Sequence, residues 1–276
     1  MKKIFFYIAI LMFTIVFTNC EDVINVDLKN ENPKLVIDAV IKWQKGTTGE
    51  NQKIILSTTS DFYSNDVPPA SGATVTITNS TNTVFDFVET PNTGEYLCNN
   101  FIPIINETYI LEVIYNGQTY TATDKLYATP VIQYVEQKSV PPIGGGEDQI
   151  QIKFFFQDNG AEDNFYLVGV QNPNYISPDY GVISDEFFQG NIMFGFYAND
   201  NLVSGQILPL NLQGISNSYF NYMNKLIAIG STNNGNPFAT PPVTLRGNLI
   251  NQTNPENYPL GNFSLGEVDT RDHIVE

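Results

Sequence analysis

The chain has 276 residues, and its 29 acidic against 13 basic side chains give a formal net charge of −16. So acidic a surface excludes nucleic acid and anionic lipid headgroups as its main partners. With 42% hydrophobic and only 15% charged residues, the chain can bury one large core or two modest ones.

The N-terminal stretch MKKIFFYIAILMFTIVFTNC contains two lysines followed by an apolar run. This run is shorter than the roughly 20 apolar residues of a membrane-spanning helix, and it fits the h-region of a secretory signal. Acidic residues follow Cys20 directly, in the pattern of a bacterial lipoprotein signal whose Cys becomes the acylated first residue. We predict a signal peptide over residues 1–19, lipidation of Cys20 and a tether over residues 20–32. An ordinary cleaved signal and an uncleaved anchor helix are the alternatives.

Several acyl chains on one Cys would form a stable anchor in a membrane. The Glu21-Asp22 pair resembles the acidic signal that directs lipoproteins of Bacteroidota to the outer face of their outer membrane. We therefore expect a lipid-anchored protein of the outer membrane that faces the cell surface. Attachment facing the periplasm is the alternative.

The second cysteine, Cys98, has no intramolecular partner if Cys20 carries lipid. Cys98 lies in the strand-like stretch GEYLCNNF, where no basic neighbour in sequence favours a thiolate. We interpret Cys98 as a small buried hydrophobe. The hydrophobic core, and not a disulfide, must then hold this exported chain together.

Residues 33–128 have the pattern of a β-sandwich. Short β-branched and aromatic runs alternate there with Gly, Asn and Pro at the spacing of sandwich strands. The Asn-Gly pair of YNGQ, residues 115–118, predicts a two-residue hairpin. In TYILEVIY, Tyr109, Leu111 and Val113 share one face of a strand. We predict an Ig-like or transthyretin-like β-sandwich domain over residues 33–128.

Residues 129–276 predict a second antiparallel β domain that carries one α-helix, so the fold class is mainly β. Its first strands form a hairpin around the tip PPIGGGEDQ, and a loop is expected at residues 179–181. SNSYFNYMNKLIAIG places apolar residues at helical spacing near residues 216–229. Ser216 or Ser218 can cap this helix, and Gly230 can end it.

Catalytic residues are scarce. The single histidine, His273, lies near the C-terminal end, where we expect the chain to fray, so a Ser-His-Asp, Cys-His or zinc site is not predicted. No glycine fingerprint of a nucleotide site follows a predicted strand and opens a helix. The run of glycines at residues 144–146 belongs to a polar hairpin tip. We predict no enzymatic activity and no cofactor. A glycoside hydrolase, which needs only two carboxylates across a cleft, is an alternative.

Two short stretches are candidate binding sites. DNGAEDN offers Asp158, Glu162 and Asp163 as oxygen ligands for calcium, although it lacks the spacing of a known calcium loop and a solvated turn is our preferred interpretation. Tyr175 and Tyr180, in NPNYISPDYG, are candidate contacts to a ligand or partner at a loop tip. Local packing is the alternative for both tyrosines.

Segments along nearly the whole mature chain carry a family resemblance. They are PKLVIDAVI, SGATVTITN, GEYLCN, YILEVIYNGQTYTA, EDNFYLVGV, SYFNYMNKL, NPFATPPVTLRGNLI and LGNFSLGEV. Together they resemble a Bacteroidota lipoprotein family catalogued only as a domain of unknown function. Where that family commonly has Gly-Tyr-Phe, this chain has Gly261-Asn262-Phe263. The family provides no catalytic residues to assign here.

The resemblance implies an accessory role in uptake, because members tend to be encoded beside TonB-dependent receptors. We expect a surface lipoprotein that partners an outer-membrane TonB-dependent transporter and binds its cargo in nutrient uptake. A structural or adhesive β protein of the cell surface is the main alternative, and a carboxylate-pair glycoside hydrolase is the third. The expected membrane contact is the lipid on Cys20.

Overall fold

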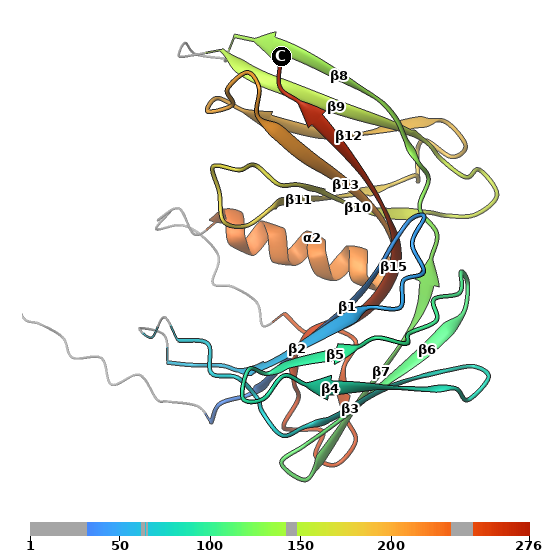
Figure 1. Cartoon of the computed structure of the whole chain (residues 1–276), viewed down its shortest axis with the longest axis vertical. Coiled ribbons are helices and arrows are strands. Elements are labelled where there is room, and N and C mark those ends of the chain that lie inside the picture. Colours follow the sequence, from blue (N-terminus) through green and yellow to red (C-terminus); the bar gives the residue numbers. More distant parts are fainter. Residues whose placement is uncertain (1–31, 62–63, 65, 142–147, 233–244) are drawn as a thin grey trace, which may run out of the picture. The chain divides into compact units, whose positions relative to one another are not determined.

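The computed structural model describes residues 32–61, 64, 66–141, 148–232 and 245–276. Residues 33–276 form one compact unit that is mainly β, with a single helix among the described residues (Figure 1). The predicted signal peptide, the lipidated Cys20 and the tether up to residue 31 lie outside the described residues.

Eight strands pair into a closed sheet in the order β15-β1-β2-β5-β4-β3-β6-β7, and a pairing of β7 with β15 closes it. The pairs β1–β15 and β7–β15 are parallel, and the other pairs of this ring are antiparallel. The eight strands are β1 (Leu35–Gln44), β2 (Gln52–Thr58), β3 (Thr74–Asn79), β4 (Val84–Glu89), β5 (Glu95–Cys98), β6 (Thr108–Tyr115), β7 (Gln118–Tyr127) and β15 (Leu260–Ile274). β14 (Ile250–Asn251) pairs with the outer part of β7.

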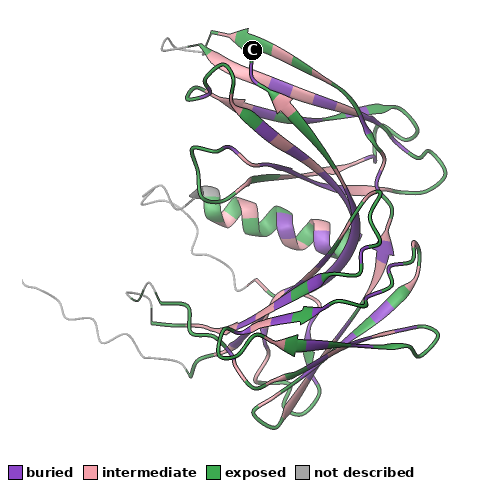
Figure 2. Cartoon of the chain, in the orientation of Figure 1, coloured by how far each residue is buried: buried purple, intermediate pink, exposed green. Residues whose placement is uncertain are grey.

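Alternation along β6 explains how these strands share one core. Tyr109, Leu111 and Val113 are fully buried, whereas Ile110 and Ile114 on the opposite face are exposed, as the sequence predicted. Buried residues from all eight strands form one hydrophobic cluster, and Figure 2 shows the same alternation along the strands. Removing these side chains from water is the main favourable contribution to folding.

The predicted hairpin between β6 and β7 is confirmed. Asn116 has φ 49° and Gly117 has φ 72°, and positive φ at both central residues is what a type I′ turn requires. Asn and Gly tolerate this left-handed backbone better than other residues do. The turn fixes the register from Tyr115 opposite Gln118 onward.

The predicted sandwich over residues 33–128 is not what the strand pairing shows. β1 to β7 do lie within this range, but β15, from the far end of the chain, joins β1 to β7 and closes the sheet. Residues 36–44 of β1 pair in parallel with residues 260–268 of β15, so the ring has no open edge at β1. The second predicted domain thus supplies a strand to the sheet of the first.

β15 continues beyond the ring and carries further strands. Residues 268–274 pair with β13, and β10 and β11 follow β13 in the same sheet. A separate three-stranded sheet has the order β12-β9-β8, and its predicted β8–β9 hairpin is confirmed. The bounds are β8 (Ile132–Val140), β9 (Gln149–Gln157), β10 (Phe165–Val170), β11 (Asp179–Ser184), β12 (Ile192–Asn199) and β13 (Ile207–Ile215).

The helix predicted near residues 216–229 is present as α2 (Asn217–Thr232). Ser216 Oγ accepts a hydrogen bond from the backbone N–H of Tyr219 at 3.2 Å, which is the N-cap contact. The helix continues past Gly230 to Thr232, three residues beyond the predicted end at residue 229. No helix among the described residues is both long and apolar enough to cross a bilayer.

The C-terminal residues are ordered in β15 and do not form the frayed end that the sequence predicted. His273 pairs with Leu208 of β13, and its Nε2 lies 2.8 Å from Oε1 of Gln137. Burial lowers the pKa of His273 below its usual value. This histidine is therefore held between two strands by an amide.

Backbones approach closely where β7, β13 and β15 meet. A Cβ atom at Gly214 would collide with the carbonyl oxygen of Ala128, and a Cβ atom at Gly266 would collide with that of Gly214. Buried Glu267 accepts a hydrogen bond from the backbone N–H of Thr129 at 3.0 Å. The domain boundary predicted between residues 128 and 129 is therefore tied to β15 by the Glu267 side chain and by close backbone packing.

Candidate ligand-binding site

A depression of about 580 Å³ lies between the outer face of β1 and β2 and helix α2. We call it the α2 pocket; in Figure 1 the helix lies between β11 and β1. Its volume falls within the range of small-molecule sites. Among its lining residues are Asp38, Lys42, Lys53, Tyr180, Tyr219, Tyr222 and Asn262.

Strand alternation on β1 directs one set of side chains into the α2 pocket. Ile37 and Ile41 are fully buried in the closed sheet, while Asp38, Val40 and Lys42 lie on the other face. Successive side chains of a strand point to opposite faces, so the apolar inner face requires this polar outer face. The charged residues of β1 are therefore presented to α2.

Asn262 joins this face from β15. It is the register partner of Asp38 in the parallel β1–β15 pair, and the neighbouring Phe263 points into the core. Asn262 is only 4% exposed, and both Oδ1 and Nδ2 are buried without a hydrogen-bond partner among the described residues. A Cβ atom at Gly247 would lie 2.8 Å from Nδ2, so the next segment packs tightly over this amide.

Three tyrosines form the wall opposite β1. Tyr180 of β11 pairs with Gly169 of β10, and its ring covers this glycine, since a Cβ atom there would lie 3.1 Å from the ring. Tyr219 and Tyr222 stand on α2 with ring centroids 6.1 Å apart and planes at 13°. Their spacing of three residues places both on one side of the helix.

The charges of Asp38 and the lysines affect the pKa values of groups in the α2 pocket. Solvent reaches Asp38, but the surrounding protein partly desolvates it and raises the pKa of its carboxyl, while Lys42 and Lys53 act in the opposite direction. Burial, followed by the charge of Asp38, raises the pKa of Tyr180 and of Tyr222. The tyrosines are therefore neutral hydroxyl groups close to a carboxylate.

The two candidate tyrosines are not brought together. Tyr180 lines the α2 pocket, but it lies on strand β11 and not on the loop predicted at residues 179–181. Tyr175 lies in a turn, is 44% exposed, and its hydroxyl accepts a hydrogen bond from Asn199 Nδ2 at 3.4 Å. It lines a separate shallow depression with residues of β12.

The three calcium candidates lie in different environments. Asp158 is buried and accepts hydrogen bonds from the Tyr166 hydroxyl at 2.9 Å and the Gly190 N–H at 2.8 Å. Glu162 and Asp163 lie exposed on the following turn. Within the described ranges, no three His, Cys, Asp or Glu side chains gather as a metal site. Asp158 thus fastens its turn to neighbouring groups.

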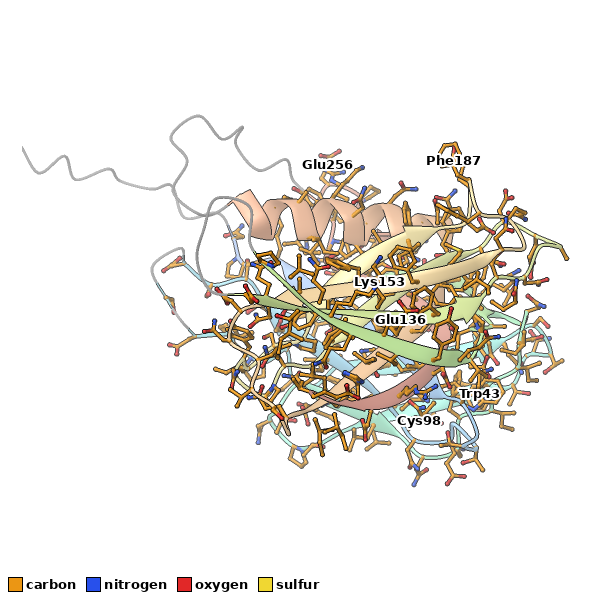
Figure 3. All side chains as sticks on the ribbon, turned by 90° about the horizontal axis from the view of Figure 1, so that it is seen from above. Trp43, Cys98, Glu136, Lys153, Phe187 and Glu256 are labelled. Atoms are coloured by element: carbon orange, nitrogen blue, oxygen red, sulfur yellow. The ribbon has the colours of Figure 1, made fainter. Side chains whose placement is uncertain are left out.

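Cys98 is buried, as interpreted from its sequence context. Its Sγ donates to Oδ1 of Asn100 at 3.1 Å, and burial raises the pKa of the thiol. Both features oppose a reactive thiolate. Figure 3 labels Cys98 and Trp43 among the side chains; the Trp43 indole donates to the Thr47 carbonyl at 2.9 Å.

A glycoside hydrolase would need two carboxylates facing each other across a depression. Asp38 is the one carboxylate among the described residues that line the α2 pocket. A depression of about 570 Å³ on the outer face of β4 and β5 holds Asp86 and Glu89. Hydrogen bonds from the backbone N–H groups of Gly72 and Gly94 lower the pKa of Glu89, whereas a general acid needs a raised pKa.

Sequence reasoning found one member of the α2 pocket and missed most others. Tyr219 and Tyr222 were interpreted only as part of the apolar stripe of a helix. Asp38 interrupts the apolar segment PKLVIDAVI, and Asn262 replaces the Tyr of a family pattern. These two irregularities were the sequence signals that could have indicated a site at Asp38 and Asn262.

Two solved structures match the chain at a distance. A two-domain fibronectin type-III segment of chicken tenascin is 10% identical, with 67% of this chain and 91% of that chain covered and a TM-score of 0.22. The alpha chain of the chicken interferon gamma receptor is 9% identical, with 67% and 89% covered and a TM-score of 0.19. At such TM-scores neither structure carries an argument about fold or function.

A search of the curated proteins gives no match. A family model described as "Domain of unknown function (DUF4249)" matches residues 21–272. The match covers every residue given above as lining the α2 pocket. The chain therefore belongs to this family of domains of unknown function.

Proposed function

We propose that this protein is a lipid-anchored binding protein of the outer membrane that serves a TonB-dependent transporter in nutrient uptake. The observation that carries the binding role is the α2 pocket. There Asp38 and Asn262 lie side by side on one sheet face, with no hydrogen bond to either side chain's polar atoms among the described residues. Buried polar groups are normally paired, so the buried, unpaired amide of Asn262 beside the solvent-reached carboxylate of Asp38 favours a binding role.

Binding, and not hydrolysis, is the proposed role of this pocket. A glycoside hydrolase needs two carboxylates about 5–10 Å apart across the substrate, and the described lining of the α2 pocket offers Asp38 alone. Lys42 and Lys53 lie near that carboxylate and favour its charged form. A lone carboxylate beside two cations suits recognition better than proton transfer.

The anchoring role rests on Cys20 and the length of chain that follows it. Residues 20–32 number 13 and span at most about 45 Å when fully extended. The first described strand starts at Leu35. A tether of this reach would let the folded unit contact a membrane protein while the acyl chains stay in the bilayer.

An exposed aromatic row supports a protein partner. Tyr134 of β8 stacks on Phe155 of β9 with centroids 4.5 Å apart, and Phe155 contacts Phe194 of β12 at 5.6 Å. Tyr134 is 40% and Phe194 42% exposed. Contiguous exposed apolar residues are typical of protein contact surfaces.

The placement is tested by protease treatment of intact cells that carry the wild type or Cys20→Ala, with mass spectrometry of the mature N-terminus. We expect a diacylated or triacylated Cys20 in the wild type, with the folded unit cleaved from outside. A periplasmic protein that stays uncut is the control. An acylated but protected chain would contradict surface exposure, and an unacylated wild type would contradict the anchor.

The alternative of a structural or adhesive surface protein draws on the same aromatic row. It predicts that the purified protein binds whole cells or extracellular matrix through this face. The transporter proposal predicts instead that binding to cells depends on the presence of the transporter. Comparing cells with and without the transporter separates the two roles.

A further inference from the structure

The charges that line the α2 pocket nearly cancel. Asp38 is negative and Lys42 and Lys53 are positive, but Lys53 is paired with Glu95 at 2.9 Å. A cationic ligand would meet the lysines on the same face, and an anionic ligand would meet Asp38. A neutral ligand is repelled neither by the lysines nor by Asp38.

The polar groups of the pocket differ in whether they donate or accept hydrogen bonds. A carboxylate such as that of Asp38 only accepts hydrogen bonds, whereas the tyrosine hydroxyls both donate and accept. In the described part of the chain, no partner bonds to the Asp38 carboxylate or to either amide atom of Asn262. The hydroxyls of Tyr180, Tyr219 and Tyr222 likewise make no hydrogen bond there.

This mixture selects among classes of ligand. An ammonium group donates only and would leave the O–H donors of the three tyrosines unsatisfied. A carboxylate or phosphate group accepts only and would oppose Asp38. Hydroxyl groups donate and accept, so several of them on one ligand can satisfy acceptors and donors that converge from different strands.

Apolar surface lies between these polar groups. Val36, Val40 and Leu167 line the pocket from the strands, and Met223 and Leu226 line it from α2. The parallel rings of Tyr219 and Tyr222 add aromatic area. A sugar ring has a C–H face that packs on such surfaces and a rim of hydroxyl groups that bonds to side chains.

From this combination we infer that the α2 pocket binds a neutral polyhydroxylated ligand of the monosaccharide or short oligosaccharide class, which rests on the ligand-binding role proposed above. Asp38, which solvent reaches, accepts hydrogen bonds from hydroxyl groups of the ligand. The tyrosines pack against the ring and bond to its rim. Specificity for a particular sugar follows from which hydroxyls meet the β1–β15 face.

The test uses the full acylated protein in a detergent without a sugar headgroup, with saturation-transfer difference NMR as the readout. The neutral probes are glucose, galactose, N-acetylglucosamine, maltose and cellobiose. The probes with charged groups are the zwitterion glycylglycine, choline and acetate, each of which has C–H protons that can report saturation. We expect saturation to reach the ring C–H protons of at least one saccharide and none of the charged probes.

Matched variants locate the binding. Asp38→Leu removes one acceptor of the pocket and is expected to weaken saccharide binding about tenfold, and Tyr222→Phe about threefold. Asp86→Leu and Tyr175→Phe make the same chemical changes outside the α2 pocket, and binding should stay unchanged. Neither the Asp38 carboxylate nor the Tyr222 hydroxyl makes a hydrogen bond within the described part of the fold, so unchanged melting temperatures serve as the folding control.

The outcomes separate this inference from the proposed function. Binding that persists in Asp38→Leu and Tyr222→Phe, or is lost equally in the control variants, would overturn the assignment to the α2 pocket. A dipeptide that binds in this pocket while no saccharide does would overturn the ligand class and leave the proposed binding role intact. Failure of every probe would overturn the inference, while recovery of a transporter partner tests the proposed function independently.

Discussion

Asp38 of β1 and Asn262 of β15 are register partners in a parallel strand pair, and both line the pocket beside α2. One is a partly desolvated carboxylate, and the other is an amide whose two polar atoms are buried without a partner among the described residues. Each such group costs free energy of folding. The pair is therefore expected to show a conflict between stability and binding.

Replacement of Asn262 by Leu tests this conflict. The amide loses no hydrogen bond within the described fold when it is removed, and Leu has a similar size. We expect Asn262→Leu to raise the free energy of unfolding by about 1 kcal/mol, which corresponds to about 2–4 °C in melting temperature. Thermal and urea unfolding measure the change.

Asn251 is the matched control for that variant. It is also buried, but its Nδ2 donates to Oε1 of Gln118 at 2.6 Å and its Oδ1 accepts from the N–H of Thr253 at 3.0 Å. Asn251→Leu should lower the free energy of unfolding by about 2–4 kcal/mol. Equal destabilisation by both variants would show that Asn262 has a structural role.

Gly266→Ala tests the close approach of β13 and β15. The added Cβ would collide with the carbonyl oxygen of Gly214 and lie 2.9 Å from Cγ of Gln213. Since backbone atoms cannot move aside cheaply, we expect a loss of about 3 kcal/mol or more. Gly230→Ala, on an open face of α2 with nothing within 4 Å, should instead stabilise by about 0.5–1 kcal/mol. Similar urea midpoints for the two variants would contradict the packing described.

Asp124 should make stability depend on pH. Burial raises its pKa to about 6, although Ser216 donates a hydrogen bond to it at 3.2 Å. The folded state therefore holds the proton more tightly than the unfolded state does. The free energy of unfolding should fall by about 3 kcal/mol as pH rises from about 4 to about 6. In urea titrations between pH 4 and 8, Asp124→Asn should remove this contribution; identical profiles would contradict it.

The aromatic surface on the three-stranded sheet predicts a separable defect in partner binding. Phe196 of β12 is 49% exposed and lies on the same face as Phe194. Phe196→Ser should reduce recovery of the transporter several-fold while the melting temperature stays unchanged. Phe187, 84% exposed and projecting from the molecule in Figure 3, provides the control Phe187→Ser. Equal recovery of the transporter with both variants would show that this aromatic surface does not contact the transporter.

Local features of the fold could be predicted from the sequence. The Asn116-Gly117 turn and the alternation of Tyr109, Leu111 and Val113 follow from interactions among near neighbours. The pairing of β1 with β15 could not be predicted, because it joins residues such as Ile37 and Gly261 that are far apart in the chain. Such a pairing depends on register across the whole sheet, which single-strand patterns do not encode.

The candidate site was also predicted in part and missed in part. Tyr180 was identified from its Pro- and Gly-rich context, although its setting was predicted as a loop. Asp38 was not identified, although it interrupts an apolar segment, because an acidic residue on the outer face of a strand usually faces water. Its different role arises from α2, which covers this face and places Tyr219 opposite β1.

The proposal is tested most directly by affinity purification of the tagged full-length protein from membranes solubilised in mild detergent, followed by mass spectrometry of the proteins recovered with it. An unrelated folded domain that carries residues 1–32 of this chain controls for anchoring alone. We predict that a TonB-dependent transporter is recovered with the full protein, with its Asp38→Leu variant, and not with the control. Recovery of no such transporter with the full protein, or equal recovery with the control, would contradict the account.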